Sequence, residues 1–235
     1  MKVRDVVLEL PQATRVFGKL KIDYCCGGDT PLGEACATAG VEVANLERML
    51  EEAERAEVQG KGSLDFQKAT LTELIGHILD KHHVYTKEEM ARLEPLVEKV
   101  ISAHGENHPE LRGVGGLFQQ LCADLKPHML KEEQILFPYI VAMERSAVEN
   151  RPAPFPPFGT VKNPVRMMMM EHETVGDLLR ELRALSSNYT APLDGCISYQ
   201  TLYQALEAFE KDLHLHIHLE NNILFPRAIE LEGTR

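Results

Sequence analysis

Two stretches of the sequence repeat one pattern of potential metal ligands. His128 is followed four residues later by Glu132, and His216 is followed four residues later by Glu220. Both pairs run into the same apolar segment, Ile-Leu-Phe-Pro. Side chains at i and i+4 share one helix face, so each pair can direct an imidazole and a carboxylate at a common point. A single pair would be read as a solvated helical contact. The repeat favours two facing helices that enclose two metal ions.

Each copy of the repeat has another histidine at a matching distance before it. His83 lies 45 residues before His128, and His172 lies 44 residues before His216. Each half of the chain therefore reads as a helix with one histidine, a connection, and a helix with the His-x-x-x-Glu pair. Two such hairpins form a four-helix bundle, and the core of such a bundle is a common place for mixed carboxylate–imidazole metal sites.

The remaining candidates have weaker support. His104 lies about six helical turns after His83 and reaches the same site only if the chain turns near Gly105. Spacing alone leaves His104 open between a ligand and a surface residue. Glu133, at i+5 from His128, is rotated off the shared face. Glu171 and Glu173 flank His172 as outer hydrogen-bond partners or surface residues. Five histidines are expected to be surface residues or outer partners: His77, His82, His108, His214 and His218.

The mixture of ligands narrows the choice of metal. Imidazole with carboxylate suits iron, zinc, manganese or copper, and one carboxylate from each of two helices suggests a dinuclear site with two bridging carboxylates. With five histidines, two bridging glutamates and a bridging oxo or hydroxo group, one of about twelve octahedral positions stays open. The histidines then divide three to two, and a small diatomic molecule would bind at the ion with two.

Composition excludes several classes of function. The chain has 235 residues and a formal net charge of -11, which argues against nucleic acid and anionic membrane surfaces as partners. No apolar run approaches the ~18 residues of a membrane span. The N-terminal segment has charges throughout and no signal-peptide core, so we expect a cytoplasmic protein. Five cysteines, an odd number, do not form a disulfide framework, and the adjacent pair Cys25 and Cys26 is unusual.

The pattern of apolar residues predicts a mostly helical chain in two domains. Turn-forming residues crowd the stretch 23–35, and an amphipathic helix is predicted over 41–57. The glycines around residue 60 indicate a linker, which gives a small domain over 1–60 and a bundle over 64–235. The long helices of the bundle are predicted at about 70–103, 111–149, 164–185 and 198–230.

Two specific segments resemble a known family. The hexapeptide Asp-Tyr-Cys-Cys-Gly-Gly at 23–28 resembles the N-terminal domain of the repair-of-iron-centres family, the iron–sulfur cluster repair di-iron proteins. The segment 216–226 is similar to the closing motif of that family, and the repeated ligand pair is similar to hemerythrin-like domains. The resemblance covers nearly the whole chain in the order of the family.

The resemblance implies an all-α fold, a hemerythrin-like four-helix bundle behind the small Cys-Cys-Gly-Gly domain. It implies two non-haem iron ions per chain, oxo- or hydroxo-bridged, and functional roles for Cys25 and Cys26. It also favours His104 as a ligand. The ligands that match the family are His83, His104, His128, Glu132, His172, His216 and Glu220.

Four functions are weighed from the sequence. The first is repair of iron–sulfur clusters damaged by oxidative or nitrosative stress through iron donation, with damaged cluster proteins as partners. The second is an enzyme that reduces nitric oxide. The third is a carrier or sensor of diatomic gases such as NO or O2, which has no need of the cysteine pair. The fourth, a bundle with structural zinc or satisfied core histidines, is disfavoured by the repeat. The sequence leaves the oligomeric state open between monomer and dimer.

Overall fold

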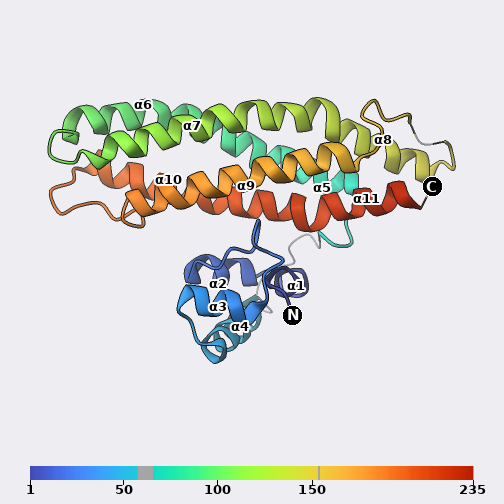
Figure 1. The fold of residues 1–235 in the computed structure, drawn as a ribbon, viewed down its shortest axis with the longest axis horizontal. Helices are drawn as coiled ribbons and strands as arrows, with labels where there is room; N and C mark the ends of the chain where they lie inside the picture. The colour runs from blue at the N-terminus through green and yellow to red at the C-terminus, as the bar shows by residue number, and fades with distance from the viewer. Residues whose placement is uncertain (58–65, 153, 235) are drawn as a thin grey trace.

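The computed structural model describes residues 1–57, 66–152 and 154–234, and they form helices joined by turns, with no β-strand in these ranges. The small N-terminal part holds α1 (Val3–Glu9), α2 (Ala13–Leu20), α3 (Leu32–Ala39) and α4 (Val43–Glu57). It lies against one side of a long bundle (Figure 1). The predicted boundary at residues 60–64 and its glycine linker fall outside the described residues.

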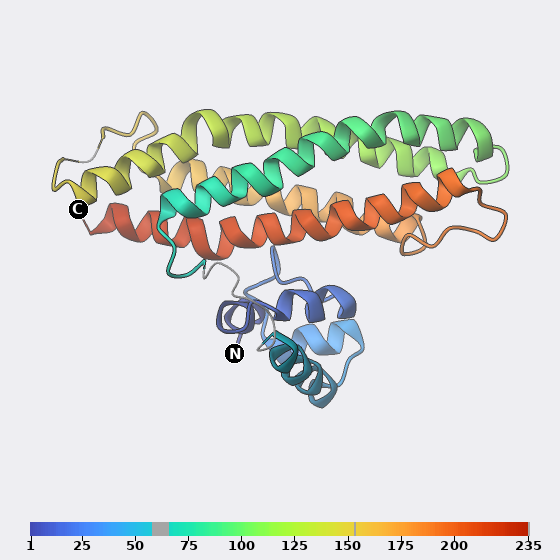
Figure 2. The same cartoon turned by 180° about the vertical axis from the view of Figure 1, so that it is seen from behind.

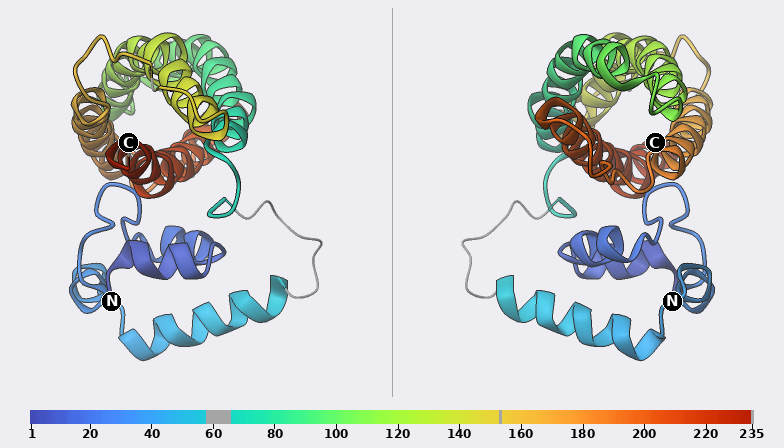
Figure 3. Two further views of the ribbon diagram at one scale, coloured as in Figure 1. Left: turned by 90° about the vertical axis from the view of Figure 1, so that its right-hand side faces the viewer. Right: turned by 90° about the vertical axis from the view of Figure 1, so that its left-hand side faces the viewer.

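The bundle has four antiparallel rods that form a ring when seen end on (Figure 3). The first rod contains α5 (Leu71–His77), η1 (Ile78–His83) and α6 (Val84–His104), and the second contains α7 (Glu110–Lys131), η2 (Glu132–Leu136) and α8 (Phe137–Val148). The third is α9 (Lys162–Leu185), and the fourth contains α10 (Ile197–Leu219), η3 (Glu220–Leu224) and α11 (Phe225–Gly233). Helix α6 packs between α7 and α10, and α7 packs on α9. The all-α four-helix bundle predicted from the sequence is confirmed.

The first rod begins at the residue that the sequence indicates. Thr70 caps α5: its hydroxyl accepts a hydrogen bond from the backbone N–H of Glu73 at 3.1 Å, and the Glu73 carboxylate accepts one from the Thr70 N–H at 2.8 Å. This reciprocal pair satisfies two backbone donors that have no partner within the helix. It fixes the start of the rod that later carries His83.

Three of the four rods contain one widened, π-helical turn, and the two copies of Ile-Leu-Phe-Pro explain two of them. Pro138 and Pro226 have no N–H, and a proline ring clashes with the carbonyl four residues earlier in a regular α-helix. The wider turns η2 and η3 immediately precede the phenylalanine–proline pair in each rod and relieve that clash. Such turns are frequent at functional sites. The repeated apolar segment therefore shapes the backbone that carries the repeated ligands.

The core consists of two apolar clusters with polar side chains between them. One cluster contains Met129, Val175 and Ile217, and the other contains Leu136 and Met168. These residues come from the same rods, one to two turns apart. The buried histidines and glutamates of the bundle lie in the interval between the clusters. Apolar packing on both sides excludes water from that interval and makes unpaired polar groups there costly.

The loop between α2 and α3 is the part of the small domain that projects toward the bundle and contacts it (Figures 1 and 2). The Asn222 side-chain amide donates a hydrogen bond to the Tyr24 carbonyl at 3.3 Å, and Arg180 lies 3.5 Å from the Asp23 carboxylate. Apolar residues of the small domain, including Phe17, belong to the same buried cluster as the bundle core. The two parts therefore share one core. No helix in the described ranges is long and apolar enough to span a membrane.

Candidate metal centre

Six buried side chains from all four rods converge in the middle of the bundle. Each is at most 2% exposed. They form two groups in which the potential ligand atoms lie within 4.8 Å of one another, and both groups contain Glu132 and Glu220. The first group adds His83 and His216, and the second adds His128 and His172. All six were predicted from the repeat and its spacing, and the structure brings them together.

Glu132 lies midway between the two groups. Its Oε2 atom is 3.4 Å from Nε2 of His83 and 3.4 Å from Nε2 of His128. Neither carboxylate oxygen has a hydrogen-bond partner among the described residues, although the side chain is 0% exposed. A buried carboxylate without partners is costly unless a cation or a donor accompanies it. Glu132 thus has the position and the free oxygens of a bridging ligand.

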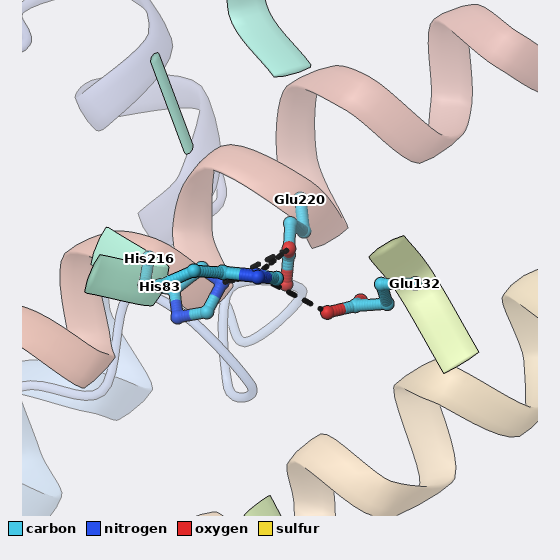
Figure 4. Close-up of side chains that lie close together, drawn as sticks. All are labelled: His83, Glu132, His216 and Glu220. Atoms are coloured by element: carbon cyan, nitrogen blue, oxygen red, sulfur yellow. Dashed lines mark hydrogen bonds and ion pairs between the residues drawn. The ribbon is translucent and has the colours of Figure 1, made fainter. Parts of the chain in front are cut away.

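Glu220 divides its two oxygens between the groups. Oε1 is 3.0 Å from Nε2 of His216, and Oε2 is 3.2 Å from Nε2 of His172. Figure 4 shows the first group, in which the imidazoles of His83 and His216 come from neighbouring rods and point at the two carboxylates. Together the two glutamates can hold a pair of cations, one for each pair of histidines.

The imidazoles meet with their nitrogens facing each other. Nε2 of His83 is 3.1 Å from Nε2 of His216, and Nε2 of His172 is 3.0 Å from Nε2 of His128. Two neutral imidazoles that present lone pairs to one point are suited to a cation between them. The donor set therefore fits a metal, because each of the two groups offers two imidazole nitrogens and oxygens from both carboxylates.

Widened turns place three of these ligands. His83 is the last residue of η1, Glu132 is the first of η2, and Glu220 is the first of η3. A widened turn changes the angular offset between neighbouring residues and so lets histidine and glutamate of one rod converge on a point. At Glu132 and Glu220, the proline-linked widening of the rods therefore helps to set the geometry of the site.

Two carboxylates outside the site orient two of the histidines. Nδ1 of His83 donates to Glu133 at 2.8 Å, and Nδ1 of His128 donates to Glu171 at 2.8 Å. This fixes the tautomer that leaves Nε2 free for a metal. Glu133 was expected to be rotated off the face that His128 and Glu132 share. It accepts a hydrogen bond from His83 of the neighbouring rod. Each carboxylate also pairs with a lysine, Lys87 and Lys131 respectively.

The other two histidines are held differently. Nδ1 of His172 donates to the side-chain oxygen of Asn221 at 2.8 Å, whereas Nδ1 of His216 has no partner among the described residues. The sequence analysis did not identify Asn221 as a partner of His172. Its position directly after Glu220 was the only feature that could have pointed to it. His82, one of the five histidines set aside, is buried, stacks on His216 and contacts Asp212 at 3.0 Å.

The carboxylates set the protonation of the metal-free site. Burial works against a charged His83, but Glu132 and Glu220 outweigh it and raise its pKa to about 10. Burial likewise opposes a charged His172, and Glu220 raises its pKa to about 9. Burial lowers the pKa of His216. Without metal, the protonated imidazoles of His83 and His172 thus partly compensate the negative charge of the two buried carboxylates.

The structure separates His104 from the other six residues. Helix α6 runs without interruption from Val84 to His104, so at 1.5 Å per residue His104 lies about 30 Å from His83. Its ring packs 5.4 Å from that of Tyr199 at the end of the bundle. We expected a turn near Gly105 to bring His104 back to the site. The structure does not show this, because helix α6 includes His104 and the chain turns only after it. The unequal division of histidines, three to two, falls with it.

The paired cysteines lie behind a ligand helix. The Cys26 thiol donates to the backbone carbonyl of His172 at 3.4 Å, and the two sulfur atoms of Cys25 and Cys26 are 3.9 Å apart. The Asp23 carboxylate accepts hydrogen bonds from the backbone N–H groups of both cysteines at 3.0 Å. A hydrogen bond with Cys26 and burial keep the pKa of Cys25 well above its ordinary value. Cys25 is therefore a protonated thiol.

Comparisons with known proteins agree with this architecture. A family model described as the hemerythrin HHE cation binding domain matches residues 74–228, and one described as a domain of unknown function, DUF542, matches residues 1–54. A probable iron–sulfur cluster repair protein of Haemophilus influenzae is 33% identical over 228 residues, which cover 97% of this chain and 96% of the relative. The iron–sulfur cluster repair protein YtfE of Yersinia pseudotuberculosis is 34% identical over 227 residues, with the same coverage. The chain belongs to the family of iron–sulfur cluster repair proteins with a hemerythrin HHE cation binding domain.

Proposed function

We propose that this protein holds two iron ions in the bundle and donates iron to iron–sulfur clusters damaged by oxidative or nitrosative stress. The observation that carries the proposal is the sharing of Glu132 and Glu220 by both pairs of histidines. Two carboxylates common to two groups of ligands favour a pair of ions over a single one. The printed names of the relatives supply the process in which the iron is used.

The imidazole and carboxylate ligands of the site suit iron that has to be released to another protein. Imidazole and carboxylate ligands bind iron without the thiolates that hold it in clusters, and His172 and Glu220 contribute only nitrogen and oxygen. When bound, the two irons, joined by an oxo or hydroxo group, supply releasable iron and redox chemistry. The residues of the chain hold the imidazoles in the metal-binding tautomer and exclude water from the site.

The proposal gives the cysteine pair a role in handling iron that leaves the site. Cys26 contacts the backbone of His172 from the outer side of α9 and is only partly buried, whereas Cys25 is buried. A thiol at this position can receive an ion released from the His172 side and pass it outward. We assign Cys26 this relay and Cys25 the support of the loop.

Metal content and the visible spectrum of the purified protein test the metal centre. Two irons per chain with absorption of an oxo-bridged diferric pair is the expected result. One metal ion per chain, or a colourless protein that holds only zinc, would contradict the di-iron proposal. Glu173→Gln, at an exposed position on α9, is a matched control that leaves metal content unchanged.

Transfer of labelled iron tests the repair function. Protein loaded with labelled iron is mixed with a cluster protein whose cluster was damaged by peroxide or nitric oxide, and label and recovered cluster are measured. Cys26→Ala is expected to slow transfer while iron content stays the same. Cys196→Ser is the control, because Cys196 is exposed and lies at the start of α10. Equal transfer by the unmodified protein, Cys26→Ala and Cys196→Ser would contradict the relay role of Cys26. Absence of transfer by all three would contradict iron donation.

Reduction of nitric oxide is the second candidate function. Because His104 lies far from the site, more coordination positions stay open than the sequence suggested, and this favours the binding of nitric oxide. With four histidines instead of five, each ion would be held by two imidazoles and the two shared carboxylates. With a bridging oxygen in addition, about one of the usual six positions on each ion would stay open, which would suit two diatomic molecules. Two NO molecules take up two electrons and two protons to give one N2O and one water, so nitrous oxide formed over multiple turnovers with an added chemical reductant would support this activity over iron donation.

The remaining proposals concern partners and place. Damaged iron–sulfur proteins are the proposed macromolecular partners, and nitric oxide and O2 the small ones. We propose the cytoplasm as the compartment, because all five cysteines are free thiols and reducing conditions keep them so.

A further inference from the structure

Three of the four histidines in the candidate metal centre have a partner for the ring nitrogen that faces away from the site. The partners are Glu133 for His83, Glu171 for His128 and Asn221 for His172. Nδ1 of His216 is buried and has no partner among the described residues. A histidine that binds metal almost always donates its second ring N–H to an acceptor. The support of the first group of ligands therefore lacks one acceptor, behind His216.

Nδ1 of His216 is one of four unpartnered, buried polar atoms on two helix faces of neighbouring rods. The others are Nε2 of His82, Oγ1 of Thr86 and Oδ2 of Asp212. His82 and Thr86 are four residues apart on the first rod, and Asp212 and His216 are four residues apart on the fourth. Residues at this spacing share a helix face. Both η1 and α6 pack on α10, so the two faces meet in one polar seam, formed by these four residues.

Printed contacts and the register of the rods bring the residues of the polar seam together. Nδ1 of His82 is 3.0 Å from Oδ1 of Asp212, which leaves Oδ2 free. The ring of His82 stacks on that of His216, with the centroids 5.6 Å apart and the planes at 8°. The rods are antiparallel, and His83 meets His216, so Thr86 lies at the level of Asp212.

The polar seam is closed to solvent on three of its four sides. His82, Thr86 and His216 are at most 3% exposed, whereas the Asp212 side chain is 24% exposed. Buried polar atoms normally have a partner, and a buried water typically makes about three hydrogen bonds to such atoms. A donor and an acceptor one helical turn apart, such as Nδ1 of His216 and Oδ2 of Asp212, can be joined by one water.

We propose that the polar seam holds one internal water, and that Asp212 positions His216 through this water. With Nε2 directed at the metal, Nδ1 of His216 carries the proton and donates it to the water. The water donates to Oδ2 of Asp212 and bonds the Thr86 hydroxyl, while His82 holds Oδ1 of the same carboxylate. Asp212 is therefore a positioning residue of the first group of ligands. This consequence rests on the proposed metal centre, whereas the water itself does not depend on metal.

A crystal structure of the metal-free protein at a resolution that shows ordered water tests the seam directly. We expect one water within about 3.2 Å of Nδ1 of His216, Oδ2 of Asp212 and Oγ1 of Thr86. A dry seam, or a direct hydrogen bond between Asp212 and His216, overturns the proposal. Neither result depends on whether the bundle binds iron.

The Thr86 hydroxyl gives a second test that needs no metal. Thr86→Val keeps the shape of the side chain and removes one partner of the water, so the melting temperature of the metal-free protein should fall by about 2–4 °C. Thr201→Val is the matched control, because Thr201 is exposed and its hydroxyl bonds only the Ile197 carbonyl one turn earlier. A melting temperature of Thr86→Val that is unchanged or raised, as for an unpaired hydroxyl, contradicts the proposal.

Competition with a chelator of known affinity, on protein loaded anaerobically with Fe²⁺, tests the positioning role. Asp212→Leu should weaken the binding of one of the two ions about tenfold and leave the other unchanged. Asp212→Asn, whose amide still bonds the water, should retain the affinity of the unmodified protein for both. Asp80→Leu, at an exposed position of η1, is the control.

The pattern across these variants separates positioning from a general structural effect. Equal weakening of both ions in Asp212→Leu, or the same loss in Asp212→Leu and Asp212→Asn, contradicts positioning through water. Unmodified protein that binds no second ion contradicts the proposed metal centre instead, and the crystal structure and the Thr86→Val melts then still decide whether the water is present.

Discussion

The thiol of Cys26 contacts the backbone carbonyl of His172, the residue whose imidazole enters the metal centre from the other side of the same helix. The small domain thus reaches the rear of a ligand rather than an exposed edge of the bundle. Gly176, one turn further along α9, also faces this thiol, and a Cβ atom there would lie 3.4 Å from the sulfur, in van der Waals contact. The cysteine loop is therefore in direct contact with the backbone of a candidate metal ligand.

Removal of a shared carboxylate should affect both metal ions. Glu132→Gln and Glu220→Gln are each expected to reduce bound metal below one ion per chain, because each carboxylate belongs to both groups of ligands. His83→Gln, which changes one group only, is expected to leave more metal than either glutamate variant. Metal analysis after desalting measures the difference. Retention of one full ion in both glutamate variants would show that the carboxylates do not bridge.

Metal binding should release protons near neutral pH. The raised pKa values of His83, about 10, and His172, about 9, mean that both are charged at pH 7 in the metal-free protein. A metal binds neutral imidazole, so on the order of two protons leave on loading. Calorimetry of metal binding in buffers of different ionisation enthalpy counts them. The number should fall toward zero above pH 10, and a count independent of pH would contradict the assignment.

The same groups set the sign of a stability change in the metal-free protein. A histidine whose folded pKa is raised stabilises the fold fully below its unfolded pKa of about 6.5, and this contribution is lost as pH rises through the folded value. The metal-free protein should therefore lose stability between pH 7 and pH 10. The metal-loaded protein, whose imidazoles are neutral throughout, should not show this loss over that interval. Thermal melts of both forms measure the difference.

Cys196 should be the most reactive of the five cysteines. Its hydrogen bond with the side chain of His104 lowers its pKa to about 7, and it is exposed at the start of α10. By contrast, burial raises the pKa of Cys122 to about 12. Alkylation by iodoacetamide, followed by mass spectrometry, should rise with pH around 7 at Cys196. His104→Gln should move this rise to higher pH, and an unchanged profile would separate His104 from the thiol.

Gly28 should be needed for docking of the cysteine loop. A Cβ atom there would lie 3.0 Å from Cβ of Arg4 and 3.2 Å from the Tyr24 carbonyl oxygen, so the loop must shift. Gly28→Ala is expected to cost about 1–3 kcal/mol of unfolding free energy, as for other forced contacts in packed regions. Gly33→Ala is the control, because a Cβ atom in that helix meets nothing within 4 Å. Urea unfolding of both variants measures the cost, and equal stability of the two would contradict the steric argument.

Local pattern was enough to single out the six predicted ligands that the structure brings together. The spacing of His128 and Glu132 is a property of helix geometry, and its repetition at His216 and Glu220 indicated the paired rods. The helix boundaries followed from caps, glycines and prolines, as at Thr70. These features depend on residues only a few positions apart, which is why the sequence alone determined them.

Tertiary structure decided the rest. His104 and His83 lie in one helical rod, and only the continuous course of α6 shows that they are about 30 Å apart. The partner of His83 is Glu133 of another rod, and that of the Cys26 thiol is a carbonyl 146 residues away. Such contacts depend on how rods and domains pack, a relation between distant segments that local spacing does not encode. The sequence by itself therefore determined which residues can bind metal, and packing decided which of them meet.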